Sequence, residues 1–305
     1  MAIVYNPLSY FVGGRRPQFA TAAQGEVAAI ERNSMLGYYR ALFPTNVPVD
    51  FIHIDEIARG KAGVYKLIIL PYPLMISEPA ARALVDYVSS GGALVAEARL
   101  AWNDERGRAK EIIPGFGLNE VCGCRETSVQ QTVSGKTEIT TAGGKIRGSL
   151  YEEVLSTTQS KILGTFADGS PAIVESSFGK GKMIAIGTFL GTSFEADKDD
   201  ATGSFIRGFI DWAGVKRPFD ANVEVRALRS GDAMIVVAFN HGEAVASNIR
   251  VALMNGAYTI RNLESGEATT ARAENGALAL THPFSAQDVW AVSVSSSSPK
   301  VSPAR

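Results

Sequence analysis

The chain has 305 residues, which is enough for two domains and a large buried core. Its composition, with 46% hydrophobic residues, 20% charged residues and a formal net charge of −1, is that of an ordinary folded protein and gives no indication of a nucleic-acid or membrane partner. The sequence contains no run of about 18 apolar residues, which is the length that a membrane helix needs, so it predicts no membrane helix. The first residues, MAIVYNPLSYFVGG, lack the basic start and the cleavage site of a signal peptide. We therefore expect a cytoplasmic protein.

The first 215 residues alternate between predicted strands and helices. Apolar and β-branched runs predict strands at 2–5, 49–54, 65–73 and 93–98, and the helical spacing of apolar residues predicts helices at 33–46, 77–92 and 202–215. Ser77 is typical of a helix N-cap, and Gly91 is typical of a residue just beyond a helix end. Because strands and helices alternate, we expect an α/β domain with a doubly wound, mainly parallel sheet and helices on both faces.

A strand-rich segment with turn signals follows, from about residue 126 to residue 187. Within it, residues 170–189 predict a hairpin that turns at Gly179, Lys180 and Gly181. The second strand of this hairpin contains MIAIG, which is apolar enough to be buried on both faces. We therefore expect that strand to return to the main sheet.

The composition changes at residues 216–223, KRPFDANV. Beyond them, short alternating segments from VEVRALRS to VWAVSV are separated by Gly and Asn turns, which predicts a small antiparallel β-sandwich. The last residues, SSSSPKVSPAR, have no apolar periodicity and are expected to be disordered. We therefore predict an α/β domain over residues 1–216, a β-sandwich over 217–294 and a tail over 295–305.

The sequence offers no complete metal or nucleotide site. Cys122 and Cys124 are its two cysteines, and a C-x-C pair is an unusual structural bridge, so we expect two reduced thiols near a helix end. No other Cys or nearby His completes a zinc site, and the acidic segment FEADKDDATG lacks the spacing of a calcium loop. The segments GKGK and VGGRR match neither a phosphate loop nor a dinucleotide-binding pattern. We expect no metal and no cofactor.

The segment after the 93–98 strand is a candidate site, because ligands of open α/β sheets bind beyond the carboxyl ends of the strands. A nucleophile elbow would present Ser or Cys on a sharp turn there, with a His within hydrogen-bond reach. Here the turn holds Glu97, Ala98 and Arg99 instead. The elbow is therefore either the site of a different chemistry or a scaffold without chemistry.

Carboxylates in this segment make glycoside hydrolysis one candidate chemistry. Glu97, Asp104 and Glu105 lie close together in the sequence, and two carboxylates must flank the scissile bond of a glycoside. His53, at the end of an earlier strand, is the candidate base, although a lone His at a strand end is more often structural. The alternative is that these acids pair with neighbouring arginines and only shape the loop.

Side chains near the predicted strand ends are also candidates for binding a sugar, whose C–H faces stack on aromatic rings. The candidates, aromatic and polar together, are Tyr5, Asn6, Tyr72, Arg99, Trp102, Arg106 and Phe189, and two further aromatic residues, Tyr10 and Phe11, lie in the same region. Together they predict a small carbohydrate or lactone-like molecule as the ligand.

Four segments together resemble a known family. They are AIVYNPLSYFVGG, GYYRALFPTNVPVDFIH, YKLIILPYPLMIS and the stretch from GGALVAEARLAWNDERG to IIPGFGLNEVCG. They are similar to the middle domain of glycoside hydrolase family 42 β-galactosidases, and residues 222–293 resemble the small C-terminal β-domain of the same enzymes. The resemblance implies an amidotransferase-like, or flavodoxin-like, fold in a non-catalytic domain that mediates trimerisation.

The resemblance also implies where the chemistry of that family lies. An N-terminal (β/α)8 barrel carries its acid/base Glu and its nucleophile Glu, and this sequence shows no such barrel, so no catalytic residue of the family is carried over to this chain. On this interpretation Glu97, Arg99, Trp102, Asp104 and Arg106 shape a loop beside a neighbouring subunit, or the rim of a sugar pocket made with a barrel.

Three hypotheses follow for the function. The first is a non-catalytic module that forms a homo-oligomer, a trimer by resemblance, with a catalytic barrel on a separate chain as a further partner. The second is a free-standing hydrolase that acts on a glycoside or a small lactone or ester at the strand ends. The third is a sugar-binding protein without turnover. An exposed apolar patch would support the first, and coupled carboxylates in a concave pocket would support the second.

Overall fold

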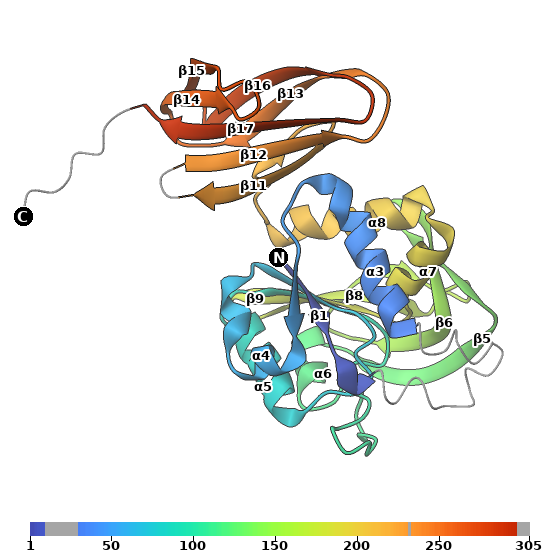
Figure 1. Cartoon of the computed structure of the whole chain (residues 1–305). Helices are drawn as coiled ribbons and strands as arrows, with labels where there is room; N and C mark the ends of the chain where they lie inside the picture. The colour runs from blue at the N-terminus through green and yellow to red at the C-terminus, as the bar shows by residue number, and fades with distance from the viewer. Residues whose placement is uncertain (10–29, 231–232, 298–305) are drawn as a thin grey trace, which may run out of the picture. The chain divides into compact units, whose positions relative to one another are not determined.

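The computed structural model describes residues 1–9, 30–230 and 233–297, and the chain divides into two compact units (Figure 1). The first unit comprises residues 1–43 and 49–215, and the second comprises residues 44–48 and 216–305. The short 44–48 segment is held in the second unit by Asn46. The Asn46 side-chain amide donates to the Val223 carbonyl at 3.0 Å, and its oxygen accepts from the Val225 backbone N–H at 2.9 Å.

The first unit is built on a nine-stranded sheet in the order β2-β1-β3-β4-β9-β8-β7-β5-β6. Its parallel strands are β1 (Ala2–Tyr5), β2 (Asp50–His53), β3 (Leu67–Leu70), β4 (Ala93–Ala96) and β9 (Gly181–Ile186). Its antiparallel strands are β8 (Pro171–Phe178), β7 (Lys161–Thr165), β5 (Arg125–Thr141) and β6 (Gly144–Ser156). The expected hairpin is confirmed as β8–β9, and β9 does return to the sheet beside β4.

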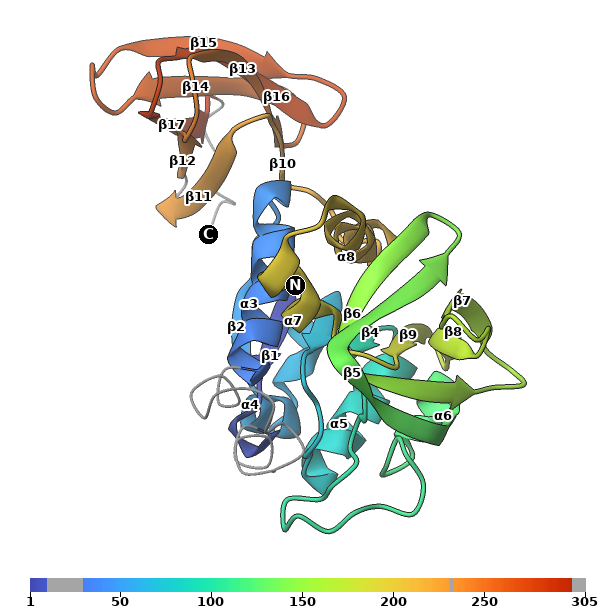
Figure 2. The ribbon, with the colours of Figure 1, turned by 90° about the vertical axis from the view of Figure 1, so that its right-hand side faces the viewer.

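Helices cover both faces of this sheet (Figure 2). One face carries α3 (Ile30–Leu42), α7 (Leu190–Asp197) and α8 (Asp200–Ala213), and the other carries α4 (Ile54–Ala58), α5 (Glu78–Ser89) and α6 (Leu118–Cys122). The 3-10 turn η3 (Lys61–Val64) also belongs to this unit, whereas η2 (Phe43–Thr45) begins at its last residue before the 44–48 segment. The doubly wound architecture is therefore confirmed. The sequence missed α4 and α6 because five residues are too few to show a helical period, and it missed α7 as well.

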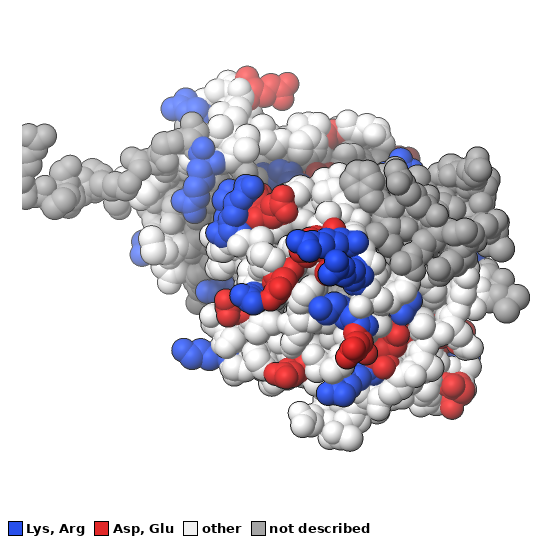
Figure 3. Space-filling view, turned by 90° about the horizontal axis from the view of Figure 1, so that it is seen from below, with Lys and Arg blue, Asp and Glu red and all other residues white. Residues whose placement is uncertain are grey.

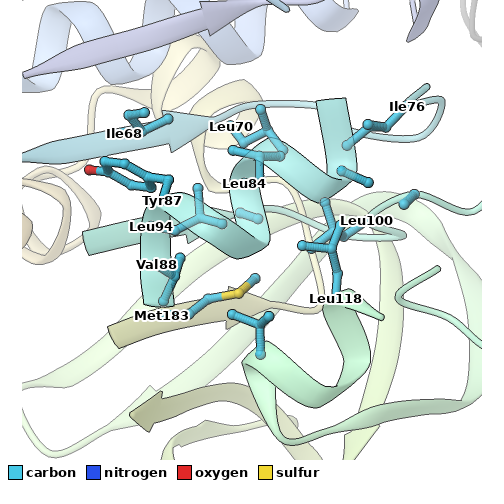
Figure 4. Packing of buried hydrophobic residues seen from close by; sticks show 14 of the residues in the cluster. Ile68, Leu70, Ile76, Leu84, Tyr87, Val88, Leu94, Leu100, Leu118 and Met183 are labelled. Atoms are coloured by element: carbon cyan, nitrogen blue, oxygen red, sulfur yellow. The ribbon is translucent and has the colours of Figure 1, made fainter. Parts of the chain in front are cut away.

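The main core lies between the sheet and the layer formed by α4, α5 and α6 (Figure 4). Ser77 caps α5, as expected, by accepting from the Ala80 N–H, and this start directs the apolar face of the helix onto the sheet. The labelled side chains of this core are Ile68, Leu70, Ile76, Leu84, Tyr87, Val88, Leu94, Leu100, Leu118 and Met183. Each fully buried side chain of this kind contributes about 1.5–3 kcal/mol, so this layer supplies much of the stability that holds the strand ends in place.

The second unit is an antiparallel β-sandwich, as expected. One sheet contains β10 (Phe219–Asp220), β13 (Val245–Ala252) and β16 (Ala277–Phe284), and the other contains β11 (Glu224–Ser230), β12 (Ala233–Asn240), β17 (Asp288–Ser296), β14 (Gly256–Asn262) and β15 (Ala268–Ala273). Strands β10 and β15 were not expected, because one is two residues long and the other, ATTARA, is mostly exposed. Strand β17 extends to Ser296, two residues into the segment assigned to the tail, and residues 298–305 lie outside the described residues.

Within the described ranges, no helix is long and apolar enough to cross a membrane. The face shown in Figure 3 carries Lys and Arg side chains interspersed with Asp and Glu, so it does not present a field of one sign.

Helices α3 and α7 approach each other at two glycines. A Cβ atom at Gly37 would overlap the Gly191 carbonyl, and a Cβ atom at Gly191 would overlap the Ser34 carbonyl. Only glycine therefore allows the two backbones to come this close. The contact places the start of α7 against α3 and, as shown below, against a buried acid.

We expect Gly37→Ala to lower the free energy of unfolding of the first unit by about 2–3 kcal/mol, because the new methyl group forces the two helices apart. The matched control is Gly208→Ala in α8, where a Cβ meets no atom within 4 Å and which should gain up to about 1 kcal/mol from helix propensity. Urea denaturation followed by circular dichroism measures both. Equal stability of the two variants would contradict the close approach.

Candidate functional site

A buried acid, Glu97, lies immediately after β4 at the carboxyl ends of the parallel strands, and its side chain is almost fully enclosed, at 2% exposure. Its carboxylate accepts from the Tyr72 backbone N–H at 3.1 Å, from the Gly191 N–H at 2.8 Å and from the Ser34 hydroxyl. The Tyr38 hydroxyl faces the same group. Burial raises the pKa of Glu97, and these donors oppose that shift. One side chain thus joins α3, the end of β3 and the first turn of α7.

The backbone around Glu97 is sharply turned. Arg99 and Ala101, just beyond it, have φ of 56° and 53°, and Tyr72 and Leu150 have φ of 47° and 71°. Residues other than glycine seldom adopt this left-handed region, and they occur preferentially at functional sites. The turn therefore has the geometry of an elbow, with Arg99 at its apex.

Arg99 lies at the centre of a second buried cluster. Its guanidinium donates to both oxygens of Glu126, at 3.0 and 3.2 Å, and lies 3.6 Å from the centre of the Trp102 ring. Its backbone N–H donates to Glu153 at 2.6 Å. Burial, followed by the charge of Glu126, raises the pKa of Glu153 well above its usual value. Glu126, the nearer acid to the guanidinium, forms the ion pair with Arg99.

Sequence reasoning missed Glu126 and Glu153 because they come from β5 and β6, 27 and 54 positions away from Arg99. One signal was present. In LYEEVLS, the period of a strand places Glu153 on the same face as the apolar Tyr151 and Leu155, and a charged residue in that position needs a buried partner. The partner itself follows only from the way β5 and β6 pair.

Aromatic rings fill the space beside the elbow. Tyr72 and Phe189 are buried, with ring centres 5.1 Å apart, and Tyr151 lies 5.8 Å from Phe189. These rings pack with Ala98 in a small apolar cluster. Their burial favours packing over the sugar stacking expected for Tyr72 and Phe189. Tyr5, at 44% exposure, is instead on the surface.

The loop after the elbow holds the next candidates. Asp104 accepts at 2.9 Å from the backbone N–H groups of both Arg106 and Arg108, and the bond from Arg108 is the main reason why the pKa of Asp104 is lowered. Glu105 and Arg106 are exposed. Asp104 thus shapes its loop through the backbone rather than through an arginine side chain. Of the three acids expected to converge, Glu97, Asp104 and Glu105, only Glu97 is buried.

The remaining candidates lie at the ends of the first strands. His53 caps α4, because its Nδ1 accepts from the Asp55 N–H at 3.1 Å, and its ring meets Tyr5 edge to face at 5.6 Å between ring centres. The Asn6 side-chain amide is buried and donates to the Met75 carbonyl at 2.9 Å. The structure therefore brings Glu97, Arg99 and Trp102 towards one place and leaves His53 near a sheet edge. Tyr10 and Phe11 lie outside the described residues.

Glu31, in the first turn of α3, is a further buried acid next to these strand ends. It accepts from the Asn6 backbone N–H, and burial raises its pKa to about 7. In the part of the chain that the structure describes, no three His, Cys, Asp or Glu side chains are grouped so as to hold a metal ion.

Residues 1–216 match the family model described as the beta-galactosidase trimerisation domain. The chain belongs to this family. Among curated relatives of this trimerisation-domain chain, beta-galactosidase LacZ from Heyndrickxia coagulans is 27% identical over 225 residues, which cover 69% of this chain and 31% of that protein. Beta-galactosidase LacA from Lactobacillus acidophilus is 29% identical over 165 residues, which cover 52% of this chain and 24% of the relative.

Solved structures share the fold of the trimerisation-domain chain. The beta-galactosidase from Bacillus circulans sp. alkalophilus aligns with a TM-score of 0.70 and 21% identity over 96% of this chain and 41% of its own. The alpha-L-fucosidase isoenzyme 2 from Paenibacillus thiaminolyticus aligns with a TM-score of 0.62 and 12% identity over 87% and 45%. The chain thus spans less than half the length of each of these proteins. Its described residues, 1–9, 30–230 and 233–297, form no (β/α)8 barrel.

We expect Glu97→Ala to lower the free energy of unfolding by about 3–5 kcal/mol, because it leaves the buried N–H groups of Tyr72 and Gly191 without an acceptor at about 1–3 kcal/mol each and opens a cavity. Glu105→Ala, in the exposed loop, is the matched control and should change stability by less than about 0.5 kcal/mol. Urea denaturation measures the difference. A similar effect of both substitutions would show that Glu97 is not an anchor.

We expect Glu31→Gln to make the chain more stable than wild type at alkaline pH. An acid whose pKa is higher when folded binds its proton more tightly in the folded state, so its contribution is complete below the unfolded pKa of about 4.5 and is lost as the pH rises through about 7. The variant should match wild type near pH 4, below the unfolded pKa, and exceed it by about 2–3 kcal/mol at pH 8. Denaturation at both pH values tests this, and Glu105→Gln should show no such divergence.

Proposed function

We propose that this chain is a non-catalytic assembly module of β-galactosidase-type proteins, which joins copies of itself into a homotrimer in carbohydrate metabolism. The observation that carries the proposal is the match of residues 1–216 to the beta-galactosidase trimerisation domain. Catalysis would then belong to another region or to a separate chain that carries a barrel.

The geometry of the strand ends supports this role. At the elbow, where an amidotransferase-like fold presents a nucleophile, this chain has Arg99, whose side chain is held by Glu126 and Trp102. The acid beside it, Glu97, accepts from backbone N–H groups of two different segments. These contacts satisfy the polar groups within the fold itself, which suits a support for neighbouring subunits.

The edge strand β2 offers a surface for a second copy. Phe51 is 48% exposed on β2, and Tyr39 of α3 lies beside it, with ring centres 5.4 Å apart. Phe43 continues this group at 5.6 Å from Tyr39. We call Tyr39, Phe43 and Phe51 the edge aromatic group. Such a group at the edge of a sheet favours association, and it lies within the segment that matches the trimerisation domain.

We expect light scattering after gel filtration to give three times the 32.5 kDa mass of the chain. Phe51→Asp should shift the population towards monomer, because it places a charge within the edge aromatic group. The control is Met254→Asp in the second unit, which alters another exposed apolar side chain, at 83% exposure, and should leave the mass unchanged. A monomeric wild type would contradict the proposal that the chain is a trimeric assembly module. A trimer insensitive to Phe51→Asp would place the interface elsewhere.

One observation favours the alternative of a free-standing hydrolase, namely the left-handed backbone at Tyr72, Arg99, Ala101 and Leu150. Its substrate would be a glycoside or a small lactone or ester. Turnover of chromogenic β-galactosides or a simple lactone by the purified chain distinguishes this alternative from the module, for which no turnover is expected. Binding of galactose without turnover would instead favour a sugar-binding protein.

A further inference from the structure

Two thiols face each other at the end of α6. The Sγ atoms of Cys122 and Cys124 are 2.9 Å apart, and the residues are 1% and 3% exposed. Both are free, and they are the two cysteines of the whole sequence. The sulfur atoms of a disulfide lie about 2.05 Å apart, so an approach of about 0.9 Å would join them.

Gly123 makes this arrangement possible. It adopts a φ of 60° directly after the helix, and this left-handed turn brings the two flanking side chains together. A Cβ atom at this position would also overlap the Ser160 hydroxyl. The local backbone therefore requires glycine between the two cysteines.

Three hydroxyl groups hold this backbone in place. Ser160 donates to the Cys122 carbonyl at 2.8 Å, Thr157 donates to the Gly123 carbonyl at 2.6 Å, and Ser176 donates to the Val121 carbonyl at 2.5 Å. The carbonyls at the end of a helix lack partners within it, so these bonds fix the last turn from outside. The two sulfur atoms are thus held close together by the fold, whereas in an unfolded chain they would meet only transiently.

A hollow of about 450 Å³ borders the pair. Cys124 lines it together with Arg125, Thr157 and Gln159. Of the two cysteines, Cys124 is the one that lines this hollow.

We propose that Cys122 and Cys124 form a redox modification site, a dithiol that closes reversibly to an intramolecular disulfide by exchange with a small disulfide. The Cys124 thiolate attacks one sulfur of the small disulfide, whose S–S bond breaks and whose leaving thiolate takes up a proton. Cys122 then loses its proton and attacks the Cys124 sulfur, which releases the second small thiol. The two protein sulfurs are oxidised, and the small disulfide is reduced to two thiols.

The equilibrium constant of this exchange, rather than its rate, is the quantity that tests the proposal. The hydrogen bond with Cys122, followed by burial, raises the pKa of Cys124, so the reactive thiolate is scarce. The bridge would fix Cys124, which directly precedes β5 and lies two residues before Glu126. Glu126 forms the ion pair with Arg99. Closure would therefore reinforce one support of the elbow, independently of the proposed assembly function.

The test equilibrates the full chain in mixtures of hydroxyethyl disulfide and β-mercaptoethanol, followed by acid quenching, thiol titration and intact mass. We expect the folded chain to lose both thiols and two hydrogen atoms, to carry no adduct and to recover on reduction. The equilibrium constant for closure should be at least about tenfold larger in the folded chain than in concentrated guanidinium chloride, which corresponds to about 1.4 kcal/mol. Equal constants, or a chain that carries hydroxyethyl adducts instead of a bridge, would overturn the proposal.

A matched variant tests the role of the fold. Thr157→Val keeps both thiols and the shape of the side chain but removes the bond to the Gly123 carbonyl and the acceptor for the Gln159 and Ser160 N–H groups. The supports of the turn are then weakened, so its folded-state constant should fall towards the unfolded value. Cys122→Ser and Cys124→Ser should each retain one thiol and form no internal bridge. If a serine variant fails to fold, the comparison of folded and unfolded wild type still decides.

Discussion

The arrangement of the first unit depends on one buried carboxylate. Glu97 lies in a position where an ionised group is costly, and the fold compensates with donors from three separate segments. Because these donors belong to α3, to the end of β3 and to the start of α7, their positions are coupled to one another. The glycine contact between α3 and α7 is part of the same constraint, since Gly191 can reach the acid only if the helix backbones lie close together.

This constraint explains why a site with the backbone of an elbow is occupied by structural side chains. The turn after β4 is strained at Arg99, as catalytic turns often are. The Arg99 guanidinium donates to both oxygens of Glu126. The apolar cluster of Tyr72, Tyr151 and Phe189 occupies the adjacent volume. Within the described residues, the polar groups of this turn and the rings beside it are therefore engaged mainly with other parts of the same fold.

Glu97 is one of several buried acids in the first unit. Glu31, Glu97 and Glu153 are all buried acids with raised pKa values, and all three lie near the carboxyl ends of the strands. In each of the three, burial, which disfavours the ionised form, is the main cause of the raised pKa.

The sequence by itself determined the architecture. The alternation of strands and helices, the Ser77 cap and the hairpin at Gly179 to Gly181 are local signals, and each corresponds to an element of the structure because hydrophobic period and turn chemistry act over a few neighbouring residues. It also indicated the segment after β4, with Glu97 and Arg99, as a candidate site. Only the tertiary structure decided what those residues do. The donors to Glu97 lie 25 to 94 positions away, and the acids around Arg99 come from a strand pair whose register no local pattern reveals. Whether a carboxylate is an anchor or a catalyst depends on its burial and its partners, and those are properties of the assembled fold.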